Sequence, residues 1–231
     1  MLTLRKSSER GYAQHAWLES YHSFSFAEYV DPAHMGYSAL RVINEDIVAP
    51  GTGFGMHPHR DMEIITYILQ GELQHQDSMG NTSVIGVGDV QRMTAGTGVR
   101  HSEVNPSSEN PVHLLQIWIL PNAAGLPPSY EEKHFSLAQK QNRWCLIASP
   151  SGEGVKIHQD VKIFATNLAQ AGQLNYFLSA HRCAYLQVVK GTVALESVLL
   201  DAGDALNIED LQDFSVSAVE NAEILLFDLP K

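Results

Sequence analysis

Short hydrophobic runs, separated by glycine, proline, asparagine and aspartate, set the pattern of the first half of the chain. Residues 64–69 combine β-branched and aromatic side chains, which favour strands. No ten-residue stretch in this half keeps the 3.6-residue period of an amphipathic helix. The pattern therefore predicts an all-β fold. The expected strands of this half are residues 40–44, 64–69, 72–77, 82–87, 101–104 and 112–120.

A second β-rich half follows residues 121–129, whose prolines and glycine predict a linker. We expect a short helix or an extended arm within residues 130–139. Strand-like runs then return at residues 144–148, 155–158, 163–168, 175–178, 184–189, 192–196 and 222–227.

A weak internal repeat relates the two halves. Residues 67–71 resemble residues 187–191, and Gly88-Asp89 resembles Gly203-Asp204. The sequence therefore predicts two antiparallel β-barrels in tandem, one over residues 1–135 and one over residues 136–231.

Histidines and carboxylates at alternate positions distinguish the first half. His57, His59, Asp61 and Glu63 have the same parity, so one continuous strand would place all four on one face. His101-Ser102-Glu103 repeats the alternation. If the two segments lie on neighbouring strands, three imidazoles and one carboxylate can bind a divalent first-row metal. The alternatives are a solvated strand face and a closed structural zinc site.

Composition narrows the choice of partners. The formal net charge of -11 disfavours direct binding to nucleic acid or to an anionic membrane. The two cysteines, Cys145 and Cys183, have no metal or redox spacing, which favours a reducing cytoplasm. The first residues lack the apolar core of a signal peptide, and no run has the length of a transmembrane helix.

Two groups of residues resemble the cupin motifs. The first is Gly51, His57, His59, Glu63 and Gly71; the second is Gly88, Asp89, Gly96, His101 and Asn105. The glutamate of the first motif lies one residue nearer its histidine than usual. The second motif has Thr94-Ala95-Gly96 where Pro-x-Gly is common, and two extra residues before His101. These departures, His101-x-Glu103 and the N-terminal segment from Trp17 to Asn44 resemble the pirin branch of the cupins.

The resemblance implies a bicupin of two jelly-roll barrels with short helical segments and one metal, held in the N-terminal barrel. The implied ligands are His57, His59, His101 and Glu103. Iron(II) is the metal expected, with manganese, cobalt, nickel, copper or zinc as alternatives. Glu63 matches the usual cupin ligand, and we rank it behind Glu103, as a support for the ligands.

The C-terminal barrel is expected to hold no metal. Counted back from the repeated glycine, the positions that match the first histidine pair are Phe177 and Ser179.

The resemblance also implies an activity, because several pirin-like proteins are quercetin 2,3-dioxygenases. Such an enzyme takes a flavonol and O2, opens the central ring and releases CO. Glu103 would serve as weak ligand and as the general base for the flavonol 3-hydroxyl. The alternative is a metal-binding regulatory protein that docks on protein partners, with quercetinase activity incidental. An open apolar pocket at the metal would favour the enzyme, and we expect a monomer.

Overall fold

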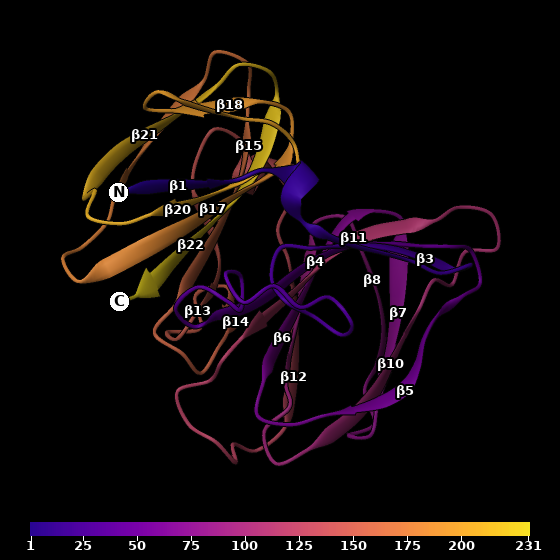
Figure 1. Ribbon diagram of the computed structural model, residues 1–231. Coiled ribbons are helices and arrows are strands. Elements are labelled where there is room, and N and C mark those ends of the chain that lie inside the picture. The colour runs from indigo at the N-terminus through magenta and orange to yellow at the C-terminus, as the bar shows by residue number, and fades with distance from the viewer. The chain divides into compact units, whose positions relative to one another are not determined.

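The computed structural model describes all 231 residues, and nearly all of its regular structure is β-strand (Figure 1). Contacts divide the chain into two compact units. The N-terminal unit contains Gly11–His134 and Val155–Gln159. The C-terminal unit contains Met1–Arg10, Phe135–Gly154 and Asp160–Lys231. The domain boundaries drawn at residues 1–135 and 136–231 stay a prediction, and the compact units include segments from both sides of that boundary.

Two sheets form the N-terminal unit. The larger sheet has the strand order β12-β9-β6-β11-β4-β3-β2, and the four-stranded sheet has the order β5-β10-β7-β8. Figure 1 shows β5, β10, β7 and β8 as one layer and β4, β11 and β6 as another. The strands are β2 (Gly11–Gln14), β3 (Leu18–His22), β4 (Leu40–Val48), β5 (Gly53–His59), β6 (Glu63–Gln70), β7 (Glu72–Asp77), β8 (Thr82–Gly86), β9 (Asp89–Thr94), β10 (Val99–Val104), β11 (Val112–Ile119), β12 (Ser129–His134) and the short β14 (Val155–Lys156).

The C-terminal unit repeats this arrangement. One sheet includes the strands β1-β20-β17-β22-β15-β13 in that order, and the other has the order β16-β21-β18-β19. The N-terminal strand belongs here because Leu2 to Arg5 pair with Ile208 to Ala205. The elements are β1 (Leu2–Arg5), η1 (Ser7–Glu9), α1 (Leu137–Lys140), β13 (Cys145–Ser149), β15 (Lys162–Leu168), β16 (Gln173–Phe177), β17 (Arg182–Lys190), β18 (Val193–Leu195), β19 (Val198–Leu200), β20 (Ala205–Ile208), β21 (Asp213–Ala218) and β22 (Ala222–Pro230).

The all-β prediction is confirmed. Each unit consists of two separate antiparallel sheets, as in a jelly roll, rather than one sheet closed into a barrel by hydrogen bonds. Residues 129–134 form the strand β12 and residues 137–140 form the short helix α1, so an extended segment and a short helix both occur where one or the other was expected.

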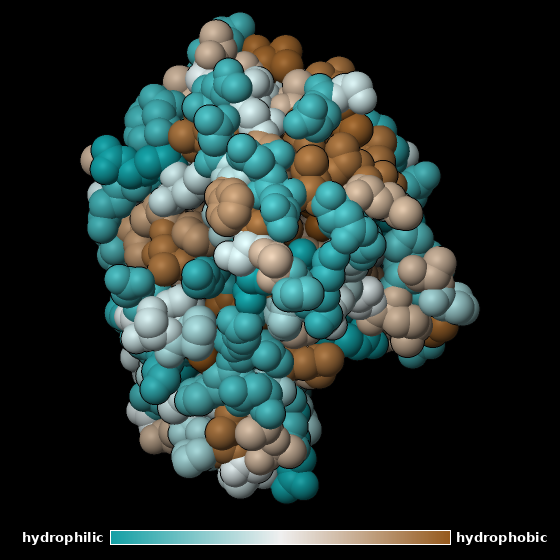
Figure 2. Space-filling model, turned by 90° about the vertical axis from the view of Figure 1, so that its left-hand side faces the viewer, coloured by the Kyte–Doolittle hydropathy of each residue, from teal (hydrophilic) through white to brown (hydrophobic).

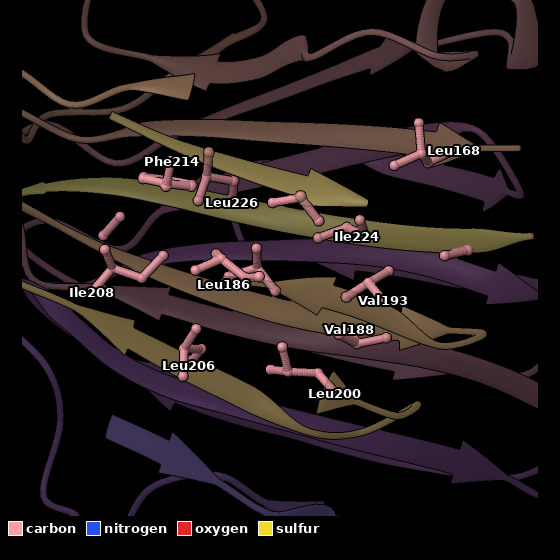
Figure 3. Packing of buried hydrophobic residues seen from close by; sticks show 14 of the residues in the cluster. Leu168, Leu186, Val188, Val193, Leu200, Leu206, Ile208, Phe214, Ile224 and Leu226 are labelled. Carbon is pink, nitrogen blue, oxygen red and sulfur yellow. The ribbon is translucent and has the colours of Figure 1, made fainter. Parts of the chain in front are cut away.

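The two units have different cores. In the C-terminal unit, apolar side chains from several strands fill the interior. Figure 3 shows Leu186 and Val188 of β17 close to Leu206 of β20 and to Leu226 and Ile224 of β22. Burial of such side chains is the main stabilising contribution to a small β-sandwich.

The buried apolar side chains of the N-terminal unit include two clusters. One contains Leu18, Val48, Ile68 and Leu114, and the other contains Ile64, Met93, Ala95 and Val99. Between these two clusters, the larger sheet carries polar side chains.

The outer surface carries no single continuous hydrophobic region on the face drawn in Figure 2, where hydrophobic patches lie among hydrophilic residues. None of the helices has the length and apolar character that crossing a membrane requires.

Candidate metal centre

Three of the histidines singled out by the sequence converge in the N-terminal unit. Strands β5 and β10 are antiparallel neighbours, and His57 lies directly opposite His101 while His59 lies opposite Val99. Opposed residues of an antiparallel pair point to the same face of the sheet. The ring centroids are 4.4 Å apart for His57 and His101, 4.7 Å for His57 and His59, and 4.9 Å for His59 and His101. One nitrogen from each ring lies within 4.8 Å of the other two, a spacing that suits a shared metal ion.

His101 provides the test of whether a metal fits these residues. Its side chain is 1% exposed, and neither ring nitrogen has a hydrogen-bond partner. A buried imidazole without partners is costly, because both nitrogens have lost their hydrogen bonds to water. Coordination of one nitrogen to a metal would remove part of that cost. The three-histidine group therefore fits a divalent metal.

The protonation of these histidines also suits metal binding. Burial, reinforced by the neighbouring imidazoles, lowers the pKa of His59 to about 4 and that of His101 to about 3. Both rings are therefore neutral near pH 7, and a neutral ring offers a lone pair. His57 donates from Nδ1 to the carbonyl oxygen of Gly55, 2.7 Å away, which leaves its Nε2 as the acceptor nitrogen.

Glu103 lies beside His101 but is turned toward the larger sheet. Its carboxylate is buried, accepts a hydrogen bond from Gln116 Nε2 at 2.8 Å, and lies 3.2 Å from the Thr66 hydroxyl. It lies within 4.8 Å of nitrogens of His101 and His75, and not in the same group as His57 and His59. The structure thus brings the four predicted ligands into one region, with three converging and Glu103 adjoining them through His101.

His75 is a neighbour that the sequence did not single out as a ligand. Its ring centroid is 5.4 Å from that of His101. Both of its nitrogens are engaged, because Nε2 lies 3.1 Å from Asp77 Oδ2 and Nδ1 lies 3.4 Å from Gln91 Nε2. His75 therefore has no lone pair directed at a shared ion and is better suited to supporting the site.

Asp61 and Glu63 do not lie on the face that carries the histidines, so the expectation of one continuous strand is wrong. Strand β5 ends at His59 and β6 begins at Glu63 in the other sheet. Asp61 lies in the intervening turn with φ of 48°, and its Oδ1 accepts a hydrogen bond from the amide of Gly125. This left-handed residue reverses the chain and breaks the alternation.

Glu63 is fully buried on another side of the fold. Its carboxylate accepts a hydrogen bond from the Thr94 hydroxyl at 2.9 Å and lies 3.0 Å from Nδ1 of His158. It therefore orients none of the converging histidines directly. Instead it ties the segment Val155–Gln159 to β6 within the N-terminal unit.

A row of polar side chains crosses the inner face of the larger sheet. His22, Asn44, Gln116, Thr66 and Gln91 occupy successive strands, each paired in register with the next. All five are buried. Glu103 reaches this row from the opposite sheet, so the polar row and the histidine strand face each other.

A cavity of about 320 Å³ opens beside the histidines. His57, His59, His101 and Glu103 contribute to its wall. Aromatic rings make up much of the remainder, namely Trp17, Phe26, Phe54 and Trp118. This volume lies within the range of about 300–1,000 Å³ typical of small-molecule sites.

The C-terminal unit has a different set of side chains at the corresponding strand. Phe177 is 68% exposed, and Ser179 is not a metal ligand of the usual kind. Both groups of residues with metal-ligand spacing lie in the N-terminal unit. A metal-free C-terminal unit stays a prediction.

Comparison with known proteins extends over both units. Residues 3–119 match the Pirin family model, and residues 146–229 match the model described as the quercetinase C-terminal cupin domain. The chain is 48% identical over 232 residues to the quercetin 2,3-dioxygenase of Escherichia coli K12, covering 100% of this chain and 99% of that protein. It is 38% identical over 231 residues to the pirin-like protein of Caulobacter vibrioides, covering 99% of each.

A solved structure is similar over the same extent. The crystal structure of the bacterial pirin YhhW from Escherichia coli, in complex with nickel(II), has a TM-score of 0.95 and 47% sequence identity to this chain. The match covers 100% of this chain and 99% of that one. The two-unit architecture is therefore shared with an experimentally determined structure.

Proposed function

The chain belongs to the pirin family of cupins, and on that premise we propose that it is a metal-dependent dioxygenase that opens the central ring of a flavonol such as quercetin and releases CO. The observation that carries this proposal is the cavity of about 320 Å³ with His57, His59 and His101 in its wall. A concave, largely apolar site with a few convergent polar groups is the usual form of a small-molecule site.

We propose that His57, His59, His101 and Glu103 hold the metal, and that the metal is iron(II). Imidazole nitrogen and carboxylate oxygen suit iron, and they also suit manganese, cobalt, nickel, copper and zinc to different degrees. The unpartnered, buried ring of His101 supports the assignment. When bound, the metal supplies a Lewis acid that favours the ionised form of a flavonol 3-hydroxyl.

Glu103 is the general base in this proposal and accepts the proton of the 3-hydroxyl. Gln116 Nε2 lies 2.8 Å from one carboxylate oxygen of Glu103, and the Thr66 hydroxyl lies 3.2 Å from the other. These two hydrogen bonds hold the carboxylate in one orientation. A base held in one orientation contributes more to proton transfer than a mobile one. The ionised flavonol is then electron-rich and open to attack by O2.

The aromatic wall positions the flat substrate. The ring of Trp118 packs edge-on against those of His59 and Phe26, with ring centroids 5.0 Å and 5.4 Å apart. Trp17 and Phe54 pack in the same way, with centroids 5.0 Å apart. These contacts fix the rings that border the cavity. Flat aromatic surfaces bury a flavonol with offset or edge contacts and keep bulk water away from the reacting carbon.

The regulatory alternative has less support, because an open cavity at the histidines is what a catalytic site requires. A cytoplasmic location is part of the proposal and is supported by the two free cysteines, Cys145 and Cys183. We also propose a monomer that binds a flavonol and O2.

Aerobic assays of protein reconstituted with each metal in turn test this proposal. Loss of quercetin absorbance together with O2 uptake is expected with iron(II), and metal-free protein should give neither. Turnover that is highest with another metal would overturn the iron assignment. The absence of turnover with every metal would overturn the dioxygenase.

A further inference from the structure

A second polar cluster lines the same cavity on the wall opposite the histidines. It consists of Ser20 and His22 on β3 and Asn44 and Asp46 on β4. Ser20 is paired in register with Asp46, and His22 with Asn44, so the four side chains share one face of the larger sheet.

The cluster is deeply buried and internally hydrogen-bonded. Each of the four residues is 2–4% exposed. The Ser20 hydroxyl donates to Asp46 Oδ1, and His22 Nδ1 lies 2.8 Å from Asn44 Oδ1. An amide oxygen only accepts, so Nδ1 of His22 carries the proton and its tautomer is fixed.

Packing alone gives no reason for polar side chains here. The next layer of the same sheet is apolar, with Leu18 and Val48 paired directly beside the cluster. Replacement of a buried polar group by an apolar one of similar shape is often neutral or stabilising. Polar residues that also line a cavity are therefore more readily explained by a ligand than by stability.

The shape and chemistry of the cavity indicate the ligand class. Phe26 and Trp118 border the cavity and accommodate a flat aromatic ring. The cluster offers an amide, a carboxyl group and a hydroxyl, which together donate and accept hydrogen bonds. A phenolic hydroxyl is both donor and acceptor and matches such a set.

We infer that Ser20, Asn44 and Asp46, with His22 holding Asn44 in place, form a subsite that binds phenolic hydroxyls on the substrate rings remote from the reacting 3-hydroxyl. The inference rests on the proposed function and adds a determinant of specificity to it. The histidine wall then binds the reacting end of the substrate, and the β3–β4 wall selects hydroxylated flavonols.

The state of Asp46 is consistent with this role. Burial raises the pKa of its carboxyl group to about 7, although the hydrogen bond from Ser20 opposes the shift. Near neutral pH a substantial fraction of Asp46 is protonated and can donate a hydrogen bond to a phenolic oxygen.

The test compares two probes that differ in the remote hydroxyls. Quercetin carries hydroxyls on both outer rings, whereas 3-hydroxyflavone carries only the reacting one. Binding is measured without O2 on the metal-loaded protein by quenching of tryptophan fluorescence, and turnover is measured separately in air. Wild-type protein should bind quercetin about tenfold or more tightly than 3-hydroxyflavone, as expected for one or two added hydrogen bonds.

Ser20→Ala and Asn44→Ala should each lower this affinity ratio about threefold to tenfold. Ser149→Ala is the matched control, because Ser149 is also buried and hydrogen-bonded but lies in the C-terminal unit. It should keep the wild-type ratio. A ratio that is unchanged in the cluster variants, or absent in the wild type, overturns the subsite.

The design separates this inference from the proposed function. Selective binding without turnover would uphold the subsite and overturn the dioxygenase. Turnover of both flavonols at equal efficiency would uphold the dioxygenase and overturn the subsite. If Asn44→Ala fails to fold, the wild-type ratio and the milder Ser20→Ala variant still decide the result.

Discussion

His57 lies directly opposite His101 across the antiparallel pair β5–β10, with ring centroids 4.4 Å apart. Two residues separated by more than forty positions in sequence are thereby placed on one face of one sheet. His59 adds a third ring from the same strand as His57. The β-ladder, rather than a flexible loop, sets the spacing of the histidines, as a preorganised metal site requires.

His101→Ala should abolish retention of the metal. The substitution removes the ring common to both groups with metal-ligand spacing. Metal per chain, measured by mass spectrometry on protein purified without chelators or a nickel column, should fall from about one to below about a tenth. His113→Ala is the matched control, because His113 lies on β11, bonds to Glu45 and does not line the cavity. Metal loss in His113→Ala, or in His181→Ala of the C-terminal unit, would contradict the assignment.

Glu103→Gln should reduce turnover more than it reduces metal content. The amide keeps the size of the side chain, but it is a poor base and a weak ligand. We expect kcat to fall by about a hundredfold or more, as for loss of a general base. Metal content should fall less, because three histidines remain. A variant that retains wild-type kcat would show that another group accepts the proton.

Asp46→Asn should stabilise the metal-free protein at alkaline pH. Burial raises the folded pKa of Asp46 from 3.8 to about 7, so the folded protein binds a proton more tightly than the unfolded chain. The stability of the wild type therefore decreases as pH rises from about 4 to about 7. The full effect is on the order of 4 kcal/mol at most.

The measurement for Asp46→Asn is the difference in Tm between variant and wild type at pH 5 and pH 8, and the gain should be larger at pH 8. Glu103, Glu45 and His113 also act on Asp46 electrostatically and are unchanged in the variant. A gain that is larger at pH 5 would contradict the burial of an ionisable Asp46.

Gly96→Ala should destabilise the loop that leads into β10. Gly96 has φ of 47°, and an added Cβ would lie 1.9 Å from the carbonyl oxygen of Leu126. The clash cannot be relieved without moving the backbone, so Tm should fall by several degrees. Gly98→Ala is the control, because Gly98 also has positive φ but its Cβ would meet nothing within 4 Å. Equal losses in the two variants would show that backbone strain alone is responsible.

Sequence patterns predicted the β-class and the two-part repeat, because alternation along strands is a local property. The histidine spacing indicated a shared site only if the two segments lie on neighbouring strands, and the pairing of β5 with β10 meets that condition for His57, His59 and His101. The positions of Asp61 and Glu63 could not be predicted, because they depend on one residue in the left-handed region that ends β5.

The polar row was missed for a different reason. Asn44-Glu45-Asp46 is a run of three polar residues, so the expected strand ended at residue 44, whereas β4 continues to Val48. Only the register of β3, β4 and β11 shows that this face is the inner one. Whether a polar side chain on this strand faces water or a cavity depends on how the two sheets pair, which the local sequence does not contain.

The most direct test of the central claim is the amount of CO released per quercetin consumed. Iron-loaded protein in air should release about one CO for each quercetin, while chelator-treated protein and Glu103→Gln release little in the same time. Quercetin left intact, or oxidised without CO, by protein loaded with iron or with any of the other metals would contradict a ring-opening dioxygenase at these histidines.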